Sequence, residues 1–326
     1  MSYDNKYIKV LGYLISIIFL YVTFKNTDLN LIFNYLYVGN IYLLLAALLF
    51  YIFFFVVRGF YQINNLLFLK SDIPFFISFS SLGIAQFYNV IFPARLGEVI
   101  RAFFLSKKQG LQKASILSYV FIEKFLDMLI ILLFLLLIIF LRTKNTELMN
   151  LLTLFSILSF SIIFSVIGYI RFNKPILHFI YLISPNKVHS LIDRFNLEIL
   201  DGLKFFKTTR QVIKSILLLL LSWAIMLGVF WLVSYPYVKL LGMPFYSCLF
   251  FMVFSALSLC IPSAPAGIGV MHYSFLLSIK ILMGGNIDVH INVIAAFVIN
   301  MHFIIMLLDI MTGGGIIAFY KFKSNH

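Results

Sequence analysis

Successive apolar segments of membrane-spanning length place the strongest constraint on how this chain can fold. Six candidate spans occur, at residues 7–24, 41–57, 114–141, 151–170, 215–233 and 291–319. An α-helix needs about 20 apolar residues to cross the hydrocarbon layer of a bilayer. Only 11% of the residues are charged, whereas a soluble domain carries about 25%. The sequence therefore predicts an all-α polytopic membrane protein whose residues 1–326 form a single transmembrane domain.

Two further apolar stretches are interrupted in the middle. Residues 75–107 and residues 245–283 each contain a cluster of helix-breaking residues, which are Pro93, Gly97, Pro262, Pro265, Gly267 and Gly269. Unwound backbone at membrane depth is tolerated only where it is buried in protein or lines a cavity. We interpret the two stretches as re-entrant hairpins with these residues at their tips.

The charges of the loops favour this interpretation. Cytoplasmic loops carry an excess of Lys and Arg, and the most basic connections are residues 107–113 and 171–214. If each interrupted stretch enters and leaves on one side, both connections and both termini are cytoplasmic. The result is about six full spans plus two hairpins of opposite orientation, an inverted repeat of the kind found in transporters. The alternative is eight plain spans, with one basic loop on the other side of the membrane.

The basic residues also bear on partners. Residues 171–214 mix charged residues with recurring apolar ones, which predicts a cytoplasmic amphipathic connector between the two halves. The formal net charge of +13 fits basic loops that attract anionic lipid headgroups. No stripe of Lys and Arg is interleaved with aromatic residues on a polar element, so we expect no nucleic-acid partner.

Three charged residues lie at the first interruption: Arg95, Glu98 and Arg101. On a helix, Glu98 and Arg101 are one turn apart and can form an ion pair. Charged side chains at membrane depth are expensive and mark functional sites, and the planar guanidinium group of Arg can make two hydrogen bonds to a phosphate. We therefore expect a phosphate-binding site here. The alternative is a cytoplasmic loop whose charges are solvated.

Two carboxylates follow in the next span. Glu123 and Asp127 are four residues apart and therefore lie on one face of a helix. They either neutralise Arg95 and Arg101 or contact a substrate or proton directly, since buried charges are normally paired. Weaker candidates for the wall of a cavity are His272, His302 and Asp309.

Several kinds of chemistry lack a sequence signal. The chain has no Gly-Lys-Ser/Thr phosphate loop, no set of His, Cys and carboxylate residues with metal-site spacing, and no nucleophile elbow. We therefore expect neither a metal nor a cofactor. Cys248 and Cys260 lie in apolar sequence and are interpreted as unreactive core thiols. The glycines at 313–315 predict close helix packing or a loosened helix end rather than a ligand site.

These motifs resemble a flippase-like family of integral membrane proteins related to the N-terminal transmembrane region of lysylphosphatidylglycerol synthases. The residues that match its first motif are Asn89, Pro93, Arg95, Gly97, Glu98 and Arg101. A second motif in the next span is matched by Glu123, Lys124 and Asp127. A third is matched by Pro262, Pro265, Gly267 and Gly269, although Ala266 replaces a glycine and His272 stands where a Glu is common.

The resemblance implies a lipid flippase-like protein of the bacterial inner (plasma) membrane. Its cargo would be a phosphate-bearing lipid, either an aminoacylated phospholipid or a polyprenyl-phosphate conjugate. The substrate-binding residues would be Asn89, Arg95, Glu98, Arg101, Glu123 and Asp127. The synthase chemistry of the family resides in a separate soluble acyltransferase domain, so the resemblance does not support synthase activity here. A separate lipid-modifying enzyme is an expected partner. The alternatives are a membrane-embedded lipid-linked transferase and a non-catalytic partner in envelope biogenesis.

Overall fold

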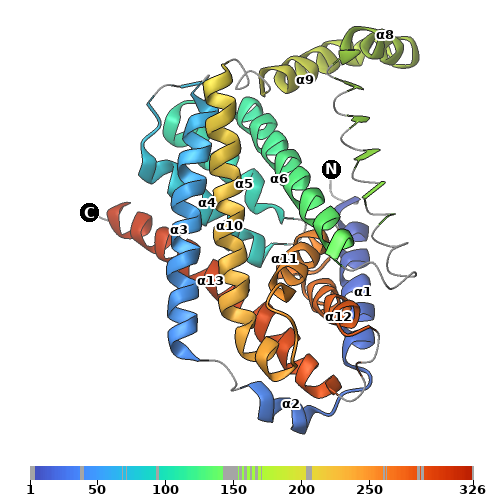
Figure 1. Cartoon of the computed structure of the whole chain (residues 1–326). Coiled ribbons are helices and arrows are strands. Elements are labelled where there is room, and N and C mark those ends of the chain that lie inside the picture. Colours follow the sequence, from blue (N-terminus) through green and yellow to red (C-terminus); the bar gives the residue numbers. More distant parts are fainter. Residues whose placement is uncertain are drawn as a thin grey trace. The chain divides into compact units, whose positions relative to one another are not determined.

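The structure is a computed structural model (Figure 1). It describes residues 4–36, 40–67, 69–70, 72–92, 95–141, scattered positions within 153–169, 171–202, 208–259, 261, 263–284, 287 and 290–324. Within these ranges every regular element is a helix and no strand occurs. The predicted all-α class is therefore confirmed. Most of the predicted span at 151–170 lies outside the described residues, as do Pro93, Pro262 and Cys260.

The helices follow the predicted alternation of long and interrupted segments. In the first part of the chain they are α1 (Asp4–Phe24), α2 (Leu29–Tyr35), α3 (Ile41–Leu66), α4 (Phe75–Ile91), α5 (Gly97–Gln109) and α6 (Lys113–Leu141). In the second part they are α8 (Asn173–Ile183), η3 (Asn186–Val188), α9 (His189–Gly202), α10 (Thr209–Leu240), α11 (Ser247–Ser258), η5 (Pro265–Gly267), α12 (Val270–Leu282) and α13 (Ile291–Ser324).

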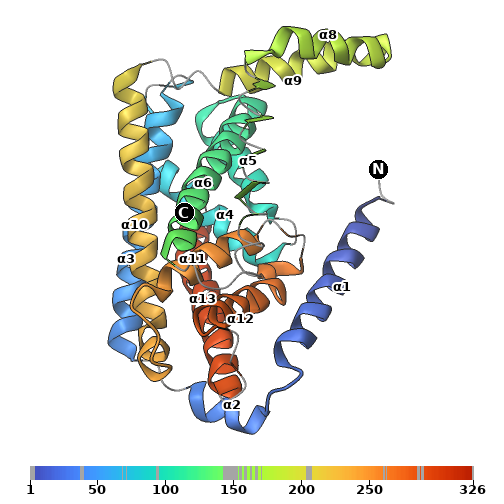
Figure 2. The ribbon, with the colours of Figure 1, turned by 45° about the vertical axis from the view of Figure 1, so that its right-hand side comes forward.

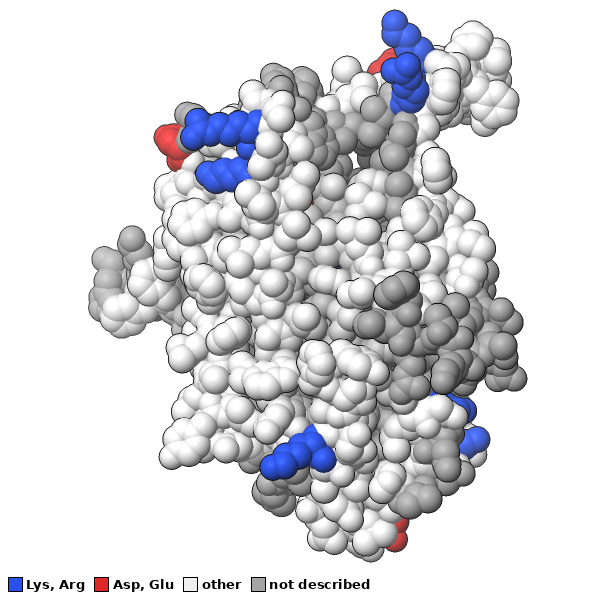
Figure 3. Space-filling view, in the orientation of Figure 1, with Lys and Arg blue, Asp and Glu red and all other residues white. Residues whose placement is uncertain are grey.

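The lengths and surfaces of these helices are those of a membrane protein. Four described helical segments are long and apolar enough to cross a bilayer: 41–66, 209–240, 265–282 and 291–322. Large apolar side chains point outward, as at Tyr42, which is 77% exposed, and Ile17, which is 62% exposed. Figure 3 shows wide uncharged surface between small groups of charged side chains. Exposed apolar surface on this scale requires a lipid environment, so the chain is a polytopic membrane protein.

The two interrupted stretches are built from short helices. Helix α4 has 17 residues and α11 has 12, which correspond to rises of about 25 Å and about 18 Å. Residues 265–282 reach spanning length only by including η5, where Ala266 has a φ of +57°. The regular helix there is α12, with 13 residues. Both stretches are therefore broken where the sequence predicts.

The chain divides into two compact units. The first comprises residues 1–60, 75–101 and 218–326, and the second comprises residues 61–74 and 102–217. The first unit contains both helix breaks and all of α13. The second unit contains α6, α8 and α9.

Glycines set the closest helix contacts of the first unit. A Cβ atom at Gly313 in α13 would lie 2.3 Å from the carbonyl oxygen of Gly83 in α4, so these two helices meet backbone to backbone. The predicted close packing of the 313–315 glycines is confirmed for Gly313. Helices α3 and α10 lie side by side in both views (Figures 1 and 2), and the ring of Phe50 packs against Gly228. Small residues at helix contacts are typical of membrane bundles.

Helix α10 is longer than the predicted span. The sequence interpretation ends this span at Val233, but the helix continues to Leu240 and includes Pro236. The extension is held by Tyr237, which is 2% exposed and whose hydroxyl donates a hydrogen bond to the carbonyl oxygen of Tyr35 at 2.8 Å. It therefore packs inside the protein, where the proline costs one backbone hydrogen bond.

Polar contacts organise the second unit. The predicted second span ends at Val57, but α3 continues to Leu66 because its last turn is polar and paired. The amide of Asn64 donates to the hydroxyl of Ser215 at 2.9 Å, and that hydroxyl donates to Asn65. Contacts of this kind replace the water that a helix end in a loop would use.

Helices α8 and α9 occupy the predicted connector. The described residues of α8 include none that is buried, and Leu182 and Ile183 are about 70% exposed. The hydroxyl of Tyr181 donates a hydrogen bond to Asp193 in α9, and this bond raises the pKa of Tyr181. An apolar helix with no buried side chain fits an amphipathic element that lies on a lipid surface, and that placement stays a prediction.

Candidate functional site

The first helix break holds an arginine in a strained conformation. Arg95 lies between α4 and α5, is half-buried, and has a φ of +54°. A non-glycine residue in the left-handed region is uncommon. Such residues cluster at ligand sites, where the surrounding structure holds them in place. The only other described non-glycine residue with positive φ is Ala266, which lies in the second break, so each break has one.

The charge of Arg95 acts on two residues from distant helices. It interacts electrostatically with Asp309 in α13 and with Tyr51 in α3. Tyr51 is 3% exposed, and its hydroxyl donates a hydrogen bond to Oδ1 of Asp309. The structure thus places two predicted site residues, Arg95 and Asp309, within electrostatic range of each other. No sequence signal marks Tyr51, because nothing distinguishes it from the other 17 tyrosines of the chain.

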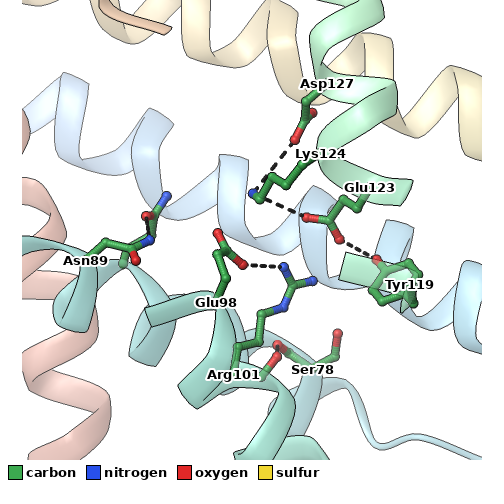
Figure 4. Close-up of polar contacts among 10 residues, drawn as sticks. Ser78, Asn89, Glu98, Arg101, Tyr119, Glu123, Lys124 and Asp127 are labelled. Atoms are coloured by element: carbon green, nitrogen blue, oxygen red, sulfur yellow. Dashed lines mark hydrogen bonds and ion pairs between the residues drawn. The ribbon is translucent and has the colours of Figure 1, made fainter. Parts of the chain in front are cut away.

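A buried ion pair opens α5. A guanidinium nitrogen of Arg101 lies 3.3 Å from Oε2 of Glu98 (Figure 4). The side chain of Arg101 is 1% exposed and that of Glu98 is 15% exposed. The predicted pairing one turn apart is confirmed. Arg101 is therefore not a solvated charge, since a charge is buried only with partners that replace water.

Gly97 fixes the place where the chain turns back on α4. A Cβ atom at this position would lie 1.9 Å from the carbonyl oxygen of Ala85 and 2.6 Å from Oδ1 of Asn89. Only a glycine permits this approach. The amide of Asn89 donates a hydrogen bond to Gln86 at 3.1 Å, while its Oδ1 is buried and has no hydrogen-bond partner within the described residues. Asn89, a predicted site residue, therefore carries an unused acceptor beside the break.

The predicted carboxylates of α6 form a second charged group, in the second unit. Glu123 and Asp127 share Lys124, whose amine lies 3.7 Å from one carboxylate and 3.9 Å from the other (Figure 4). The hydroxyl of Tyr119 donates a hydrogen bond to Glu123 at 2.5 Å. Glu123 is 2% exposed. Their predicted position on one face is confirmed, and the prediction that they neutralise Arg95 and Arg101 stays a prediction.

The second helix break is clamped by α1. Gly269 has a φ of +85°, and a Cβ atom there would lie 2.2 Å from the carbonyl oxygen of Ser16. The hydroxyl of Ser16 accepts a hydrogen bond from the backbone N–H of Ala264 at 2.9 Å. No sequence signal marks Ser16, because a serine in an apolar span carries no pattern of its own.

Two histidines close the second break. His302 of α13 contacts the carbonyl oxygen of Ala266 at 2.9 Å and the ring of His272 at 3.3 Å. His272 in turn accepts a hydrogen bond from the backbone N–H of Gly269 at 3.2 Å. These two predicted residues therefore act as a pair. No group of three or more metal-binding side chains occurs in the part of the chain that the structure describes.

Long apolar helices, an uncharged outer surface and buried charges beside broken helices define a polytopic membrane protein with a polar site. The chain belongs to the family described as the lysylphosphatidylglycerol synthase TM region, whose profile matches residues 9–312. The match includes both breaks and every charged group described above, and it confirms the resemblance seen in the motifs. Comparisons with curated proteins and with solved structures found no match. The family places the chain among membrane proteins of lipid modification or transport.

Proposed function

We propose that this chain binds a phosphate-bearing lipid at the first helix break and translocates it across the bacterial inner membrane. The observation that supports this most is the conformation of Arg95, held with a φ of +54° at a helix break inside an apolar protein. Arg95 is half-buried, whereas Arg101 of the same segment is almost completely buried. Of the two arginines, Arg95 is therefore the one that a headgroup can reach.

The neighbours of Arg95 suit an exchange of counter-ions. Asp309 lies within electrostatic range of the Arg95 guanidinium group, and Tyr51 keeps the carboxylate oriented by a hydrogen bond. An arriving phosphate makes the two parallel hydrogen bonds that a guanidinium group favours. Asp309 is then available to the amine of an aminoacylated headgroup. The unused acceptor of Asn89 is a second group that a headgroup amine or hydroxyl can meet.

The broken helices support transport rather than simple binding. Helix α4 contacts η5, so the first limb of one interrupted stretch meets the break of the other. Short helices that break at a polar site and pack on one another are typical of transporters with inverted repeats. We propose that both stretches are re-entrant, that both termini are cytoplasmic, and that Glu123 and Asp127 of α6 serve the same transport.

Arg95→Ala should reduce lipid translocation by about tenfold to a hundredfold, the range expected for losing a charge-assisted bidentate contact. Arg95→Lys should retain part of the activity, because it keeps the charge without the planar fork. The measurement is dithionite quenching of fluorescently labelled phosphatidylglycerol and of its aminoacylated derivative in proteoliposomes. Lys239→Ala, which removes an exposed cation at the end of α10, is the matched control and should translocate like the wild type.

Equal translocation by Arg95→Ala and the wild type, with both proteins equally folded, would overturn the proposed function. Formation of a modified lipid without movement between leaflets would favour the transferase alternative. Loss of folding in Arg95→Ala together with loss of transport would favour the partner alternative, in which this cluster only supports the structure.

Placing a cysteine at Leu96 should show whether the first break is at membrane depth. Leu96 is 44% exposed on the protein surface, so only the surrounding lipid would protect it. In a background with Cys248→Ser and Cys260→Ser, we expect Leu96→Cys to react slowly with a membrane-impermeant maleimide from either side and rapidly after denaturation. Lys239→Cys serves as the accessible control. Rapid labelling of Leu96→Cys from one side would contradict the re-entrant placement.

A further inference from the structure

The contacts of the second break form a closed ring of hydrogen bonds. The ring runs from the backbone N–H of Gly269 to His272, from His272 to His302, and from His302 to the carbonyl oxygen of Ala266. Both ends of the series are therefore backbone groups of the same break, three residues apart. The imidazole rings meet edge to face, with centroids 4.4 Å apart.

The two backbone ends fix the protons of both rings. A backbone N–H only donates, so Nδ1 of His272 must accept from Gly269 and carries no proton. Nε2 of His272 then carries the proton and donates it to Nδ1 of His302. Nε2 of His302 carries a proton as well and donates to the carbonyl oxygen of Ala266, which only accepts. Both histidines are therefore neutral and protonated on Nε2.

An additional proton has no place in this arrangement. On Nδ1 of His272 it would point at the N–H of Gly269. An additional proton on Nδ1 of His302 would displace the hydrogen bond that this nitrogen accepts from His272. The Nε2 proton of His272 would then have to move to Nδ1 of the same ring, where it would face the N–H of Gly269. Either way, one hydrogen bond of the break is lost and a donor faces a donor.

The surroundings offer no compensation for a positive charge. His272 is faced by His302 from α13 and by the ring of Phe24 from α1. His302 is faced by His272 and by the Ala266 carbonyl of η5. Apart from the two histidines themselves, no carboxylate and no cation among the described residues of α1, α4, α11, α12 and α13 contacts or electrostatically influences either ring.

We infer that the His272–His302 pair is a proton-binding site whose occupation opens the second break. Proton binding and the closed break exclude each other, because every imidazole nitrogen of the pair already serves as a donor or an acceptor in the closed break. In the open form the rings lose these contacts, and an unperturbed histidine takes a proton near pH 6.5. By linkage, acid below this pH favours the open form. This inference does not depend on the lipid proposal.

Opening would act first at the start of α12. The bond lost on protonation is that of Gly269, the residue whose backbone packs directly against Ser16 of α1. Releasing Gly269 therefore loosens the clamp between α1 and the second break. Because η5 also contacts α4, the change reaches the first interrupted stretch as well.

Hydrogen exchange of the full chain in lipid nanodiscs tests the inference. After correction for the intrinsic pH dependence of exchange, amides of residues 263–269 should exchange faster at pH 5.5 than at pH 7.5. The expected factor is about tenfold if one ring takes a proton on opening, and about a hundredfold if both do. The double variant His272→Gln/His302→Gln should show no such pH dependence. Amides of α10 provide the internal control.

Nitrogen NMR of the ¹⁵N-histidine-labelled wild type provides a test that needs no folded variant. Both rings should be neutral and protonated on Nε2 at pH 7.5, with assignments from His272→Asn and His302→Gln. A charged ring, or an Nδ1-protonated ring, at pH 7.5 would overturn the inference. Exchange at 263–269 that is independent of pH in the wild type would overturn it too, whatever the outcome of the transport assays.

Discussion

Replacing Gly97 with alanine should prevent the first break from closing and abolish function. The new Cβ atom would lie 1.9 Å from a backbone carbonyl oxygen of α4, and neither partner is a flexible side-chain end that can move aside. Overpacking in a core costs about 1–3 kcal/mol, and the rigidity of both partners places this variant at the upper end, near 3 kcal/mol. The measurement is the free energy of unfolding in mixed micelles, determined by titration with SDS.

Gly315→Ala is the matched control for this prediction. Gly315 lies in α13 and its φ is not positive, and among the described residues outside its own stretch of helix no atom lies within 4 Å of the position that a Cβ atom would take. Alanine is favoured over glycine inside a helix by about 1 kcal/mol, so the control should be neutral or slightly stabilising. If both variants unfold alike, the close approach of Gly97 to Ala85 does not exist in the folded protein.

The second large effect is expected at the Glu98–Arg101 pair. Glu98→Gln removes the negative charge that pairs with the guanidinium group of Arg101, whose side chain is 1% exposed. Breaking a buried ion pair by removing one partner costs about 3 kcal/mol or more, because the remaining charge stays buried. We therefore expect Glu98→Gln to lower the unfolding free energy by about 3 kcal/mol, measured by the same titration.

A double-mutant cycle separates this pairing from the other contacts of the two residues. The methionine side chain in Arg101→Met is similar in length to arginine but carries no charge. The double variant Glu98→Gln/Arg101→Met should therefore be more stable than the sum of the two single effects predicts. Strictly additive losses would show that Glu98 and Arg101 do not stabilise each other, and that Arg101 is balanced by other contacts.

Much of the fold could be predicted from local sequence. The long apolar segments identify the spanning helices, and the proline and glycine clusters identify both breaks, because each of these signals acts within a few residues. Helix ends were less predictable. Helix α3 extends past Arg58 because Asn64 and Asn65 meet Ser215, a residue about 150 positions away. Pairings at that distance leave no trace in the local pattern.

The same distinction applies to the site. Glu98 and Arg101 pair within one turn, so their spacing predicts the contact. Tyr51 and Asp309 are 258 positions apart, and their contact depends on how α3 and α13 pack. The sequence identified His272 and His302 as separate weak candidates, since only the folded second break brings their rings together.

Helix α13 carries two residues that each act on one of the helix breaks. His302 holds the second break through Ala266, and Asp309 is coupled to Arg95 of the first break. The two residues are seven positions apart, which places them about 10 Å apart along the same face of one helix. Backbone contact between Gly313 and Gly83 leaves this helix little freedom to shift sideways. Turning α13 about its axis would therefore displace Asp309 and His302 together, so a headgroup that moves Asp309 would also shift His302.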